Sequence, residues 1–334
     1  MDHRLHQDQP VAEAHVSTGR LPGPERVARL LAEAHARFRT VTDGTVADYI
    51  PALARVPAAL FGLAVVGVNG AVHTEGDCGH EFSIQSVSKP FVFALVCQAL
   101  GGQIARQRVG VNATGLPFNS VMAIELNPAR TVNPMVNAGA IATTSLAPGD
   151  TAAAKWRFVQ EGLSRFAGRS LVLDEEIHAS EAATNQRNQG IARLLDAYGR
   201  IYCDPAVAVD VYTRQCALKV TCRDLAVMGA TLADGGVNPV TGERVLDADR
   251  CQRVLAVMAT AGLYEESGDW LYEVGLPGKS GVGGGIVTIA PGKGSLGVFA
   301  PPLDAAGNSV RGQLATKYLS EALGMNLFAS RPEA

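Results

Sequence analysis

The segment at residues 279–300, KSGVGGGIVTIAPGKGSLGVFA, determines the fold that we expect for this chain. Two β-rich runs, at 285–290 and 295–300, flank the turn PGKG at 291–294. Runs of β-branched and apolar residues on either side of a Gly- and Pro-rich turn are typical of a β-hairpin. The glycines at 281–285 precede the first run and indicate a place where the backbone bends tightly or approaches another group closely.

A second hairpin is predicted far upstream, at residues 60–74 (LFGLAVVGVNGAVHT). Asn69 and Gly70 separate its two β-rich runs, and an Asn-Gly pair accepts the positive φ angles of a type I′ turn. Apolar residues at helical spacing predict a helix at 25–39 and another at 313–323. Between the hairpins helical patterns dominate, at residues 87–100, 152–166, 185–198, 223–233 and 248–261.

Strands from both halves of the chain and a helical middle predict one antiparallel sheet that distant segments close together. We expect an α/β protein with α+β layering, in which helices flank the sheet and a helical subdomain lies beside it. Residues 1–24 are expected to form a flexible leader, followed by a single domain at 25–334. Within that domain a sheet subdomain should take about 25–85 and 266–334, and a helical subdomain about 86–265.

The composition narrows the classes of protein. The 334 residues are 47% hydrophobic and 18% charged, which is enough apolar material for a large core. Lys+Arg number 29 against Asp+Glu 32, so the chain lacks the basic excess that nucleic-acid binding requires. No apolar run reaches the roughly 18–20 residues of a membrane span, and the first 24 residues do not resemble a secretory signal. We therefore expect a soluble, cytoplasmic protein with no nucleic-acid or membrane partner.

The cysteines and histidines do not indicate a metal site. The six cysteines form no C-x-x-C pair, and in a reducing compartment they are expected to be free thiols. The seven histidines follow no ligand spacing, whereas zinc sites need clustered nitrogen and sulfur ligands. We expect neither a metal nor an organic cofactor.

The main candidate for chemistry is Ser86 with Lys89, in the segment FSIQSVSKPF at 82–91. A spacing of three residues at the start of a helix places both side chains on one face. A lysine that is kept neutral by its apolar surroundings can take the proton of a serine hydroxyl, while the free N–H groups of the helix start favour an oxyanion. On spacing alone, a capping serine and a surface lysine remain the alternative.

The K-S-G of the segment at 279–300 is the second candidate. A K-[ST]-G at the start of a strand, downstream of S-x-x-K, is typical of penicillin-recognising serine acyl-transfer enzymes. The N–H of Val282 could complete an oxyanion hole with the N–H of the serine. A plain Gly-rich turn and a phosphate-binding loop are the alternatives. Ser-His-Asp catalysis is a further rival, with His73, His80 or His178 as the base.

The chain resembles the serine-dependent glutaminases, which occur in bacteria and as the catalytic domain of animal enzymes. The resemblance extends over residues 43–328 and rests most firmly on two long motifs, NPMVNAGAI at 133–141 and KSGVGGG at 279–285. Other matching blocks are ADYIP at 47–51, S-x-x-K at 86–89, PFNS at 117–120, SE at 180–181, RN at 187–188, GLY at 262–264 and PPLD at 301–304.

The resemblance implies a role for each matching position. Ser86 is similar to the family nucleophile, Lys89 to its base and Tyr264 to a tyrosine that helps move the proton. The main chain of Ser86 and Val282 would hold the oxyanion. The remaining positions match the substrate clamp of the family, namely Tyr49, Asn137, Glu181, Asn188 and Tyr212. Such a clamp suits glutamine, because Glu181 can bind the α-ammonium and the neutral amides and phenols can bind the α-carboxylate.

The expected activity is the hydrolysis of L-glutamine to L-glutamate and ammonia through a covalent acyl-serine intermediate, without a cofactor. The resemblance implies a β-lactamase/transpeptidase-like fold and a homo-oligomer, either a dimer or a tetramer. Two alternatives stay open. One is another penicillin-recognising serine hydrolase, acting on a β-lactam, a D-Ala peptide or an ester. The other is a binding module that kept the fold and lost turnover.

Overall fold

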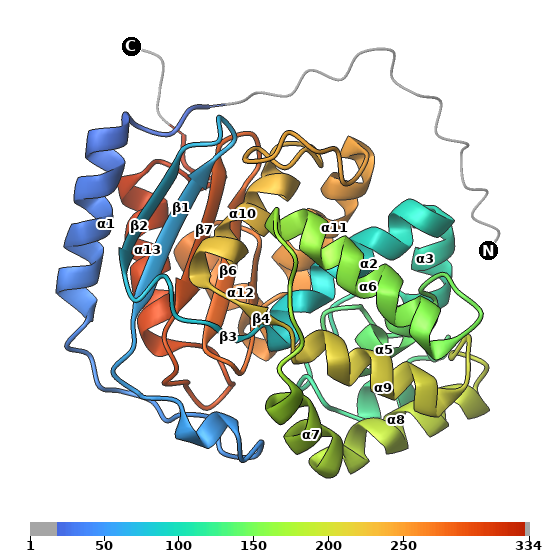
Figure 1. The fold of residues 1–334 in the computed structure, drawn as a ribbon. Coiled ribbons are helices and arrows are strands. Elements are labelled where there is room, and N and C mark those ends of the chain that lie inside the picture. Colours follow the sequence, from blue (N-terminus) through green and yellow to red (C-terminus); the bar gives the residue numbers. More distant parts are fainter. Residues whose placement is uncertain (1–18, 331–334) are drawn as a thin grey trace, which may run out of the picture.

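The computed structural model describes residues 19–330, and these form two adjoining layers (Figure 1). One layer is a five-stranded antiparallel sheet with helices on both faces, and the other consists of helices. The first eighteen residues of the expected leader lie outside the described residues. The fold class that the sequence predicted, an antiparallel sheet flanked by helices beside a helical layer, is confirmed.

The sheet has the strand order β2-β1-β7-β6-β5, so both predicted hairpins are present and lie side by side. In it β1 (Gly62–Gly67) pairs with β2 (Val72–Gly76) on one side and with β7 (Gly294–Phe299) on the other. In turn β6 (Gly285–Ala290) pairs with β7 and with the short edge strand β5 (Gly278–Ser280). The pairing of β1 with β7 closes the sheet between the two ends of the chain.

Both faces of the sheet are covered. Leu63 and Val65 of β1 face one apolar cluster, while Ala64 and Val66 face another, so every residue of β1 is buried. A strand that is covered on both faces reads as a continuous apolar run, which explains the LAVV of β1. The helices on the first face are α1 (Pro24–Phe38), α12 (Ser267–Val274) and α13 (Val310–Ala322).

The helix α10 (Cys222–Ala233) covers the other face and packs closely on β7. A Cβ at Gly297 would lie 2.1 Å from the carbonyl oxygen of Cys222, so only glycine permits this approach. The sequence placed this segment in the helical subdomain at 86–265, and here the expected boundary differs from the structure. The periodicity of α10 predicts a helix, but it does not say which layer buries its apolar side.

The second layer is built around α2 (Ser88–Leu100), whose first ten residues are all buried. Three of its other helices were also predicted, namely α6 (Ala152–Ala167), α8 (Gln186–Ala197) and α11 (Ala248–Ala261). The sequence did not predict α3 (Gly102–Val109), α4 (Met122–Glu125), α5 (Asn137–Ser145), α7 (Glu175–Thr184) or α9 (Pro205–Cys216). Three short 3-10 turns are η1 (Leu53–Arg55), η2 (Gln85–Val87) and η3 (Tyr264–Glu266).

A two-stranded ladder joins the layers. Here β3 (Phe82–Ser83) pairs with β4 (Lys219–Val220), with Phe82 opposite Val220. The ring of Phe82 stacks on Phe299 of the large sheet at a centroid distance of 4.1 Å. The chain runs from β3 directly into η2 and α2, so this ladder fixes the point at which the S-x-x-K segment begins.

Candidate active site

The segment that carries Ser86 and Lys89 bends sharply before it becomes a helix. Gln85 has a φ of 48°, and it is one of three non-glycine residues with positive φ in the described chain. Such a conformation is unfavourable for a residue with a Cβ and persists only where the surroundings enforce it. Ser86 follows in η2, and Lys89 comes one turn later in the first turn of α2. Both side chains therefore lie on the same face, as the sequence predicted.

Lys89 is buried in the apolar interior, with only 1% of its surface exposed. Its Nζ donates a hydrogen bond of 2.7 Å to Asn137 Oδ1. Burial lowers the pKa of Lys89 to about 8, and the nearby Cys216 and Glu181 oppose this shift. A substantial share of the lysine is therefore neutral at slightly alkaline pH, which is the form that can accept a proton.

Tyr264 lies against the serine from η3, the short turn between α11 and α12. A hydrogen bond to Ser86 favours the phenolate, but burial is the larger effect and raises the pKa of Tyr264. The phenol donates to the carbonyl oxygen of Ser280 at 3.2 Å. Tyr264 has a φ of 61°, so two of the three strained non-glycine residues lie in this site.

A second buried lysine lies behind that tyrosine. Lys279 Nζ is 4.1 Å from the centre of the Tyr264 ring and donates to the same Ser280 carbonyl at 2.6 Å. Burial and the proximity of Lys89 lower the pKa of Lys279 well below its usual value. Tyr264 and Lys279 thus donate to the same carbonyl oxygen. Lys279 also packs against the face of the Tyr264 ring, and the hydroxyl of that ring bonds Ser86.

Two backbone N–H groups are free to bind an oxyanion. Ser86 and Val282 are both buried, and neither backbone N–H donates a hydrogen bond to any residue in the part of the chain that the structure describes. Buried N–H groups are nearly always paired, so two unpaired ones beside a serine indicate a ligand position. The K-S-G lies at the end of β5 and not at a strand start as predicted, and Val282 lies in the turn that follows.

The polar residues of the expected clamp form one hydrogen-bonded chain. Asn137 Oδ1 accepts from Tyr212 Oη at 3.2 Å as well as from Lys89, and Asn137 Nδ2 donates to Asn188 Oδ1 at 3.0 Å. This network fixes the orientation of the Asn137 amide. Asn137 begins α5, and its N–H donates to the carbonyl of Phe118 at 2.8 Å.

Glu181 is the carboxylate of the site and is only 7% exposed. Its Oε2 accepts a hydrogen bond from Gln85 Nε2 at 3.3 Å. Burial raises the pKa of Glu181 to about 7, against the lowering effects of Gln85 and Lys89. Glu181 and Asn188 lie on two helices, α7 and α8, which meet at Asn185. Residues seven apart would share one face of a continuous helix, but here the helix is interrupted between Glu181 and Asn188.

These residues surround a cavity of about 220 Å³. Pockets for drug-sized ligands measure about 300–1,000 Å³, so this cavity suits a smaller molecule. Tyr49 lines its rim and is 54% exposed, whereas the serine and the clamp lie within. The lining residues are Tyr49, Ile50, Gln85, Ser86, Phe118, Asn119, Asn137, Glu181, Thr184, Asn185, Arg187, Asn188, Tyr212 and Val282.

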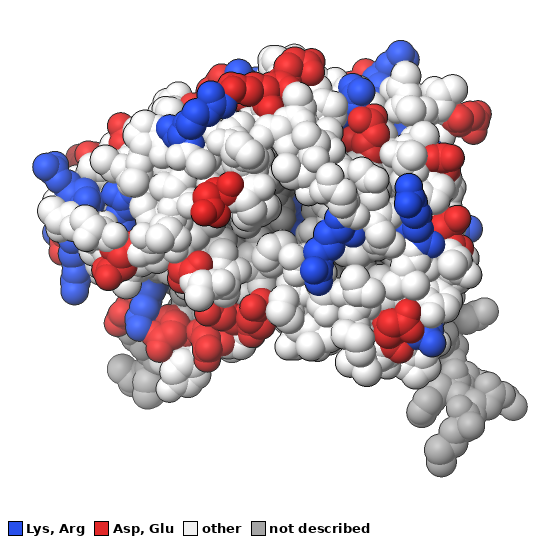
Figure 2. Space-filling view, turned by 90° about the horizontal axis from the view of Figure 1, so that it is seen from below, with Lys and Arg blue, Asp and Glu red and all other residues white. Residues whose placement is uncertain are grey.

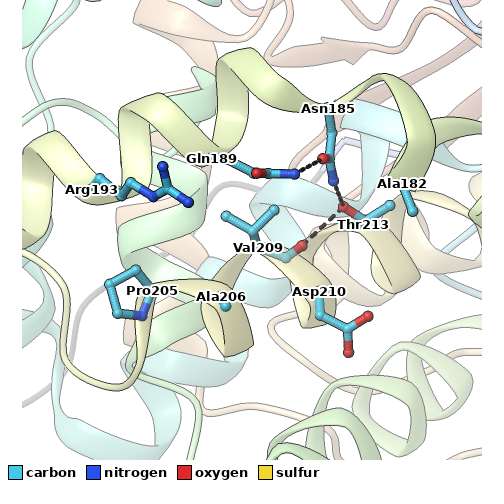
Figure 3. A pocket seen from close by; sticks show the side chains of 9 residues that line it. All are labelled: Ala182, Asn185, Gln189, Arg193, Pro205, Ala206, Val209, Asp210 and Thr213. Atoms are coloured by element: carbon cyan, nitrogen blue, oxygen red, sulfur yellow. Dashed lines mark hydrogen bonds between the residues drawn. The ribbon is translucent and has the colours of Figure 1, made fainter.

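A second cavity, of about 280 Å³, lies behind the clamp between α7, α8 and α9 (Figure 3). Asn185 lines both cavities, and its amide is held by Thr213 and Gln189. Arg193 and Asp210 also line this second cavity (Figure 3). The joint between α7 and α8 is therefore held from behind by hydrogen bonds, which keeps Glu181 and Asn188 in place.

Seven of the expected site residues line the cavity, and Lys89 and Tyr264 lie behind it, bonded to Asn137 and Ser280. Sequence reasoning did not assign a role to three others. Gln85 bonds the carboxylate of the clamp, Asn185 joins the two helices of the clamp, and Lys279 supports the tyrosine. Two of these have a signal in the sequence, because Gln85 precedes the serine and Lys279 belongs to the K-S-G. Asn185 has none.

Three further findings concern the surface charge, metal binding and membrane spans. Basic side chains are scattered over the face seen in Figure 2 without forming a continuous surface, several acidic side chains gather at its lower left, and a hollow lies near its middle. Within residues 19–330 no group of three or more His, Cys, Asp and Glu residues is arranged to hold a metal ion. No helix in the same range has both the length and the apolar character needed to cross a membrane.

Comparison with known proteins gives one consistent result. The profile of the Glutaminase family matches residues 44–328. The chain is 63% identical to Glutaminase 2 of Yersinia pestis over 318 residues, which cover 95% of this chain and 94% of that protein. It is 52% identical to the glutaminase of Colwellia psychrerythraea, over 90% of this chain and 97% of that protein.

Solved structures agree with these relatives. A probable glutaminase named ybaS superposes with a TM-score of 0.91 at 44% identity, over 92% of this chain and 100% of the other. A probable glutaminase from Bacillus subtilis complexed with 6-diazo-5-oxo-L-norleucine gives a TM-score of 0.83 at 31% identity, over 90% of this chain and 97% of the other.

Proposed function

Since the chain belongs to the glutaminase family, and glutamine is the substrate of glutaminases, we propose that it hydrolyses L-glutamine through a covalent ester on Ser86. The observation that supports this mechanism best is the arrangement around that serine. A buried lysine with a lowered pKa lies one turn along, and two unpaired N–H groups lie beside the hydroxyl. The cavity of about 220 Å³ has the size for one amino acid.

In the first step neutral Lys89 takes the proton of Ser86, and Ser86 Oγ attacks the side-chain amide carbon of glutamine. The N–H groups of Ser86 and Val282 bind the resulting oxyanion. Donors fixed in this way stabilise the transition state more than the ground state, and the loss of one such donor typically costs about 3–4 kcal/mol. The Lys89 ammonium or Tyr264 then gives a proton to the amide nitrogen, the C–N bond breaks, and ammonia leaves.

In the second step water attacks the ester carbon and the same groups act in reverse. Lys89 or Tyr264 takes a proton from the water, the C–O bond to Ser86 breaks, and the serine recovers its proton as L-glutamate forms. Every atom of the products comes from glutamine and water, so the mechanism needs no redox partner. Asn137 binds both Lys89 and Tyr212, and it thereby ties the base to the clamp.

The clamp explains why an amino acid fits. Glu181 is a buried carboxylate that lacks a cationic partner within ion-pair distance among the described residues, so the α-ammonium of the substrate would fill that place. Tyr49, Asn188 and Tyr212 offer neutral donors for the α-carboxylate. Binding of the ammonium also favours the ionised form of Glu181, whose pKa in the free site is raised to about 7.

Glu181→Gln is expected to raise KM for L-glutamine by roughly 10- to 100-fold, because one hydrogen-bonded charge pair is worth about 1.5–3 kcal/mol. The variant should change KM little for glutaramate, which is glutamine without the α-amino group. Steady-state ammonia release from both substrates measures this difference. The matched control is Glu176→Gln on the same helix, where the glutamate is exposed and pairs with Arg55. Equal effects of Glu181→Gln on both substrates would contradict the ammonium assignment.

Lys279→Met is expected to lower kcat about tenfold with little change in KM, because Lys279 positions Tyr264 and does not line the substrate cavity. Without Lys279, the Ser280 carbonyl accepts a hydrogen bond from the Tyr264 phenol only, so it binds the phenol proton more strongly. The contact of the ammonium group with the Tyr264 ring is also lost. In a Tyr264→Phe background the same change should have almost no effect on kcat. Lys155→Met is the matched control, since Lys155 is also buried and bonds two carbonyls, but lies outside the site. Additive losses in the double variant would refute the coupling.

The two rival functions are separated by substrate. Ammonia release from L-glutamine supports the proposal. Turnover of the β-lactam nitrocefin without glutaminase activity would favour a penicillin-recognising hydrolase, and no turnover of either would favour a binding module. The clamp favours glutamine, because a β-lactam or an ester has no need of a buried carboxylate for an α-ammonium.

We also keep two finer predictions from the sequence, a cytoplasmic location and a homo-oligomer. The six cysteines are unpaired thiols in the structure, which agrees with a reducing compartment. Light scattering on the purified chain would measure the subunit number.

A further inference from the structure

Two cysteines outside the active site lie together beside the β3–β4 ladder. Cys78 lies in the turn before β3, and Cys222 is the first residue of α10, directly after β4. Because β3 and β4 are antiparallel, the chain before β3 runs alongside the chain after β4. The Sγ of Cys222 donates to the carbonyl oxygen of Cys78 at 3.8 Å, so the two residues are in direct contact.

The two thiols differ in exposure and in acidity. Cys78 is partly exposed and Cys222 is buried. Hydrogen bonds from Cys222, Thr74 and its own backbone N–H lower the pKa of Cys78 to about 6. Burial and the charge of Glu75 oppose this lowering of the Cys78 pKa, but the hydrogen bonds that the sulfur accepts outweigh them. In the thiol form Cys78 Sγ donates to the Gly76 carbonyl at 3.3 Å. The hydrogen bond to Cys78 and burial raise the pKa of Cys222 well above its usual value.

We propose that Cys78 and Cys222 form an oxidation site at which a hydroperoxide converts the pair into a reversible disulfide. An accessible sulfur that reacts first and a buried neighbour that reacts second are the two parts such a site requires. Neither thiol lines the cavity that holds Ser86, so this chemistry is separate from the hydrolysis of glutamine.

The reaction balances with hydrogen peroxide as the oxidant. The Cys78 thiolate attacks one peroxide oxygen, the O–O bond breaks, and a sulfenic acid and hydroxide form. The sulfur of Cys222 then attacks the Cys78 sulfur, the S–O bond breaks, and a disulfide and water form. The thiol proton of Cys222 ends in water. Two thiols lose two electrons in total, and one peroxide is reduced to two waters.

The resulting link would join the chain that leads into the nucleophile segment to the start of the helix on the sheet. The disulfide would close a loop of the chain from residue 78 to residue 222, which includes Ser86, Asn137, Glu181 and Tyr212. A cross-link that closes a long loop restricts the unfolded chain. We therefore expect the oxidised protein to unfold at a higher temperature than the reduced protein, by about 5 °C or more.

Peptide mapping of the full-length protein tests the proposal. The reduced protein is treated with hydrogen peroxide near neutral pH, alkylated with iodoacetamide and digested without reductant. The expected product is a peptide that joins Cys78 to Cys222 and disappears after treatment with dithiothreitol. Cys203 is the matched control, because it is also partly exposed but burial raises its pKa. Without peroxide, Cys78 should be alkylated at least about tenfold faster than Cys203.

Two variants assign the order of reaction. In Cys222→Ala, peroxide should leave a Cys78 sulfenic acid that dimedone traps, with no disulfide at this site. In Cys203→Ser the disulfide should form as in the wild type. The proposal is overturned if Cys78 stays unoxidised, if it pairs with another cysteine, or if it is alkylated no faster than Cys203. The wild-type map decides the matter even if Cys222→Ala fails to fold.

Discussion

Ser86→Ala should lower kcat for ammonia release from L-glutamine by at least about 10⁴-fold, the largest effect of any single substitution in this chain. Removal of the nucleophile from a serine hydrolase typically costs about 10⁶-fold in kcat, and the oxyanion hole and substrate binding account for the activity that remains. Here both N–H donors and the clamp stay in place, so KM should change little. Steady-state kinetics with an ammonia-coupled assay gives both parameters.

A covalent probe makes this test independent of turnover. The relative from Bacillus subtilis was solved with 6-diazo-5-oxo-L-norleucine, which carries an amino-acid head and a reactive diazoketone at the far end. We expect this compound to add to the wild-type chain and not to Ser86→Ala, as measured by intact mass. Ser88→Ala is the matched control, since Ser88 is buried two residues away and donates to the Gln85 carbonyl. If Ser86→Ala kept its activity or its labelling, another residue would be the nucleophile.

Lys89→Met should lower kcat by about 10²- to 10⁴-fold, the usual contribution of a positioned general base. It should also change the pH dependence. Below the Lys89 pKa of about 8 the side chain is an ammonium that cannot accept the serine proton, so wild-type kcat should rise as pH increases from about 6 to 9. In Lys89→Met this rise should be absent, because the titrating amine is gone.

A second titrating group, Glu181, should shape the pH profile of kcat/KM on its acidic side. Glu181 has a pKa of about 7 in the free site, and its protonated form cannot pair with the substrate ammonium, so KM should increase as pH falls below 7. Lys89→Met should retain this change in KM, whereas Glu181→Gln should remove it. A kcat profile of Lys89→Met that still rises through pH 8 would show that Lys89 is not the base.

The fold was predictable where short-range chemistry decides it. Asn69-Gly70 and the turn at 291–294 each predict a hairpin locally, and both hairpins are present. The type I′ turn does not form, because Gly70 has a positive φ and Asn69 does not. The helix α5 was not predictable in the same way. All nine of its residues are buried and small or polar ones predominate, so it has no apolar stripe with helical periodicity. Its position depends on neighbours far away in the chain.

In the site, too, the features set by local sequence were predictable and those set by distant contacts were not. The spacing of Ser86 and Lys89 predicted one shared face, and Val282 could be named because it follows the K-S-G. The partner of Lys89 could not be named from spacing, because Asn137 is 48 residues further along and the two meet only through packing of α2 on α5. The strained φ of Gln85 and Tyr264 is also a property of the folded chain, since nothing in either residue type favours it.

The proposed oxyanion site takes one N–H group from each layer, since Ser86 enters the helical layer and Val282 follows an edge strand of the sheet. During refolding, either layer could regain its backbone structure without producing a functional catalyst. We therefore expect the recovery of turnover to trail the recovery of helicity. A substitution at the junction of the layers could consequently abolish activity while leaving the circular dichroism spectrum almost unchanged.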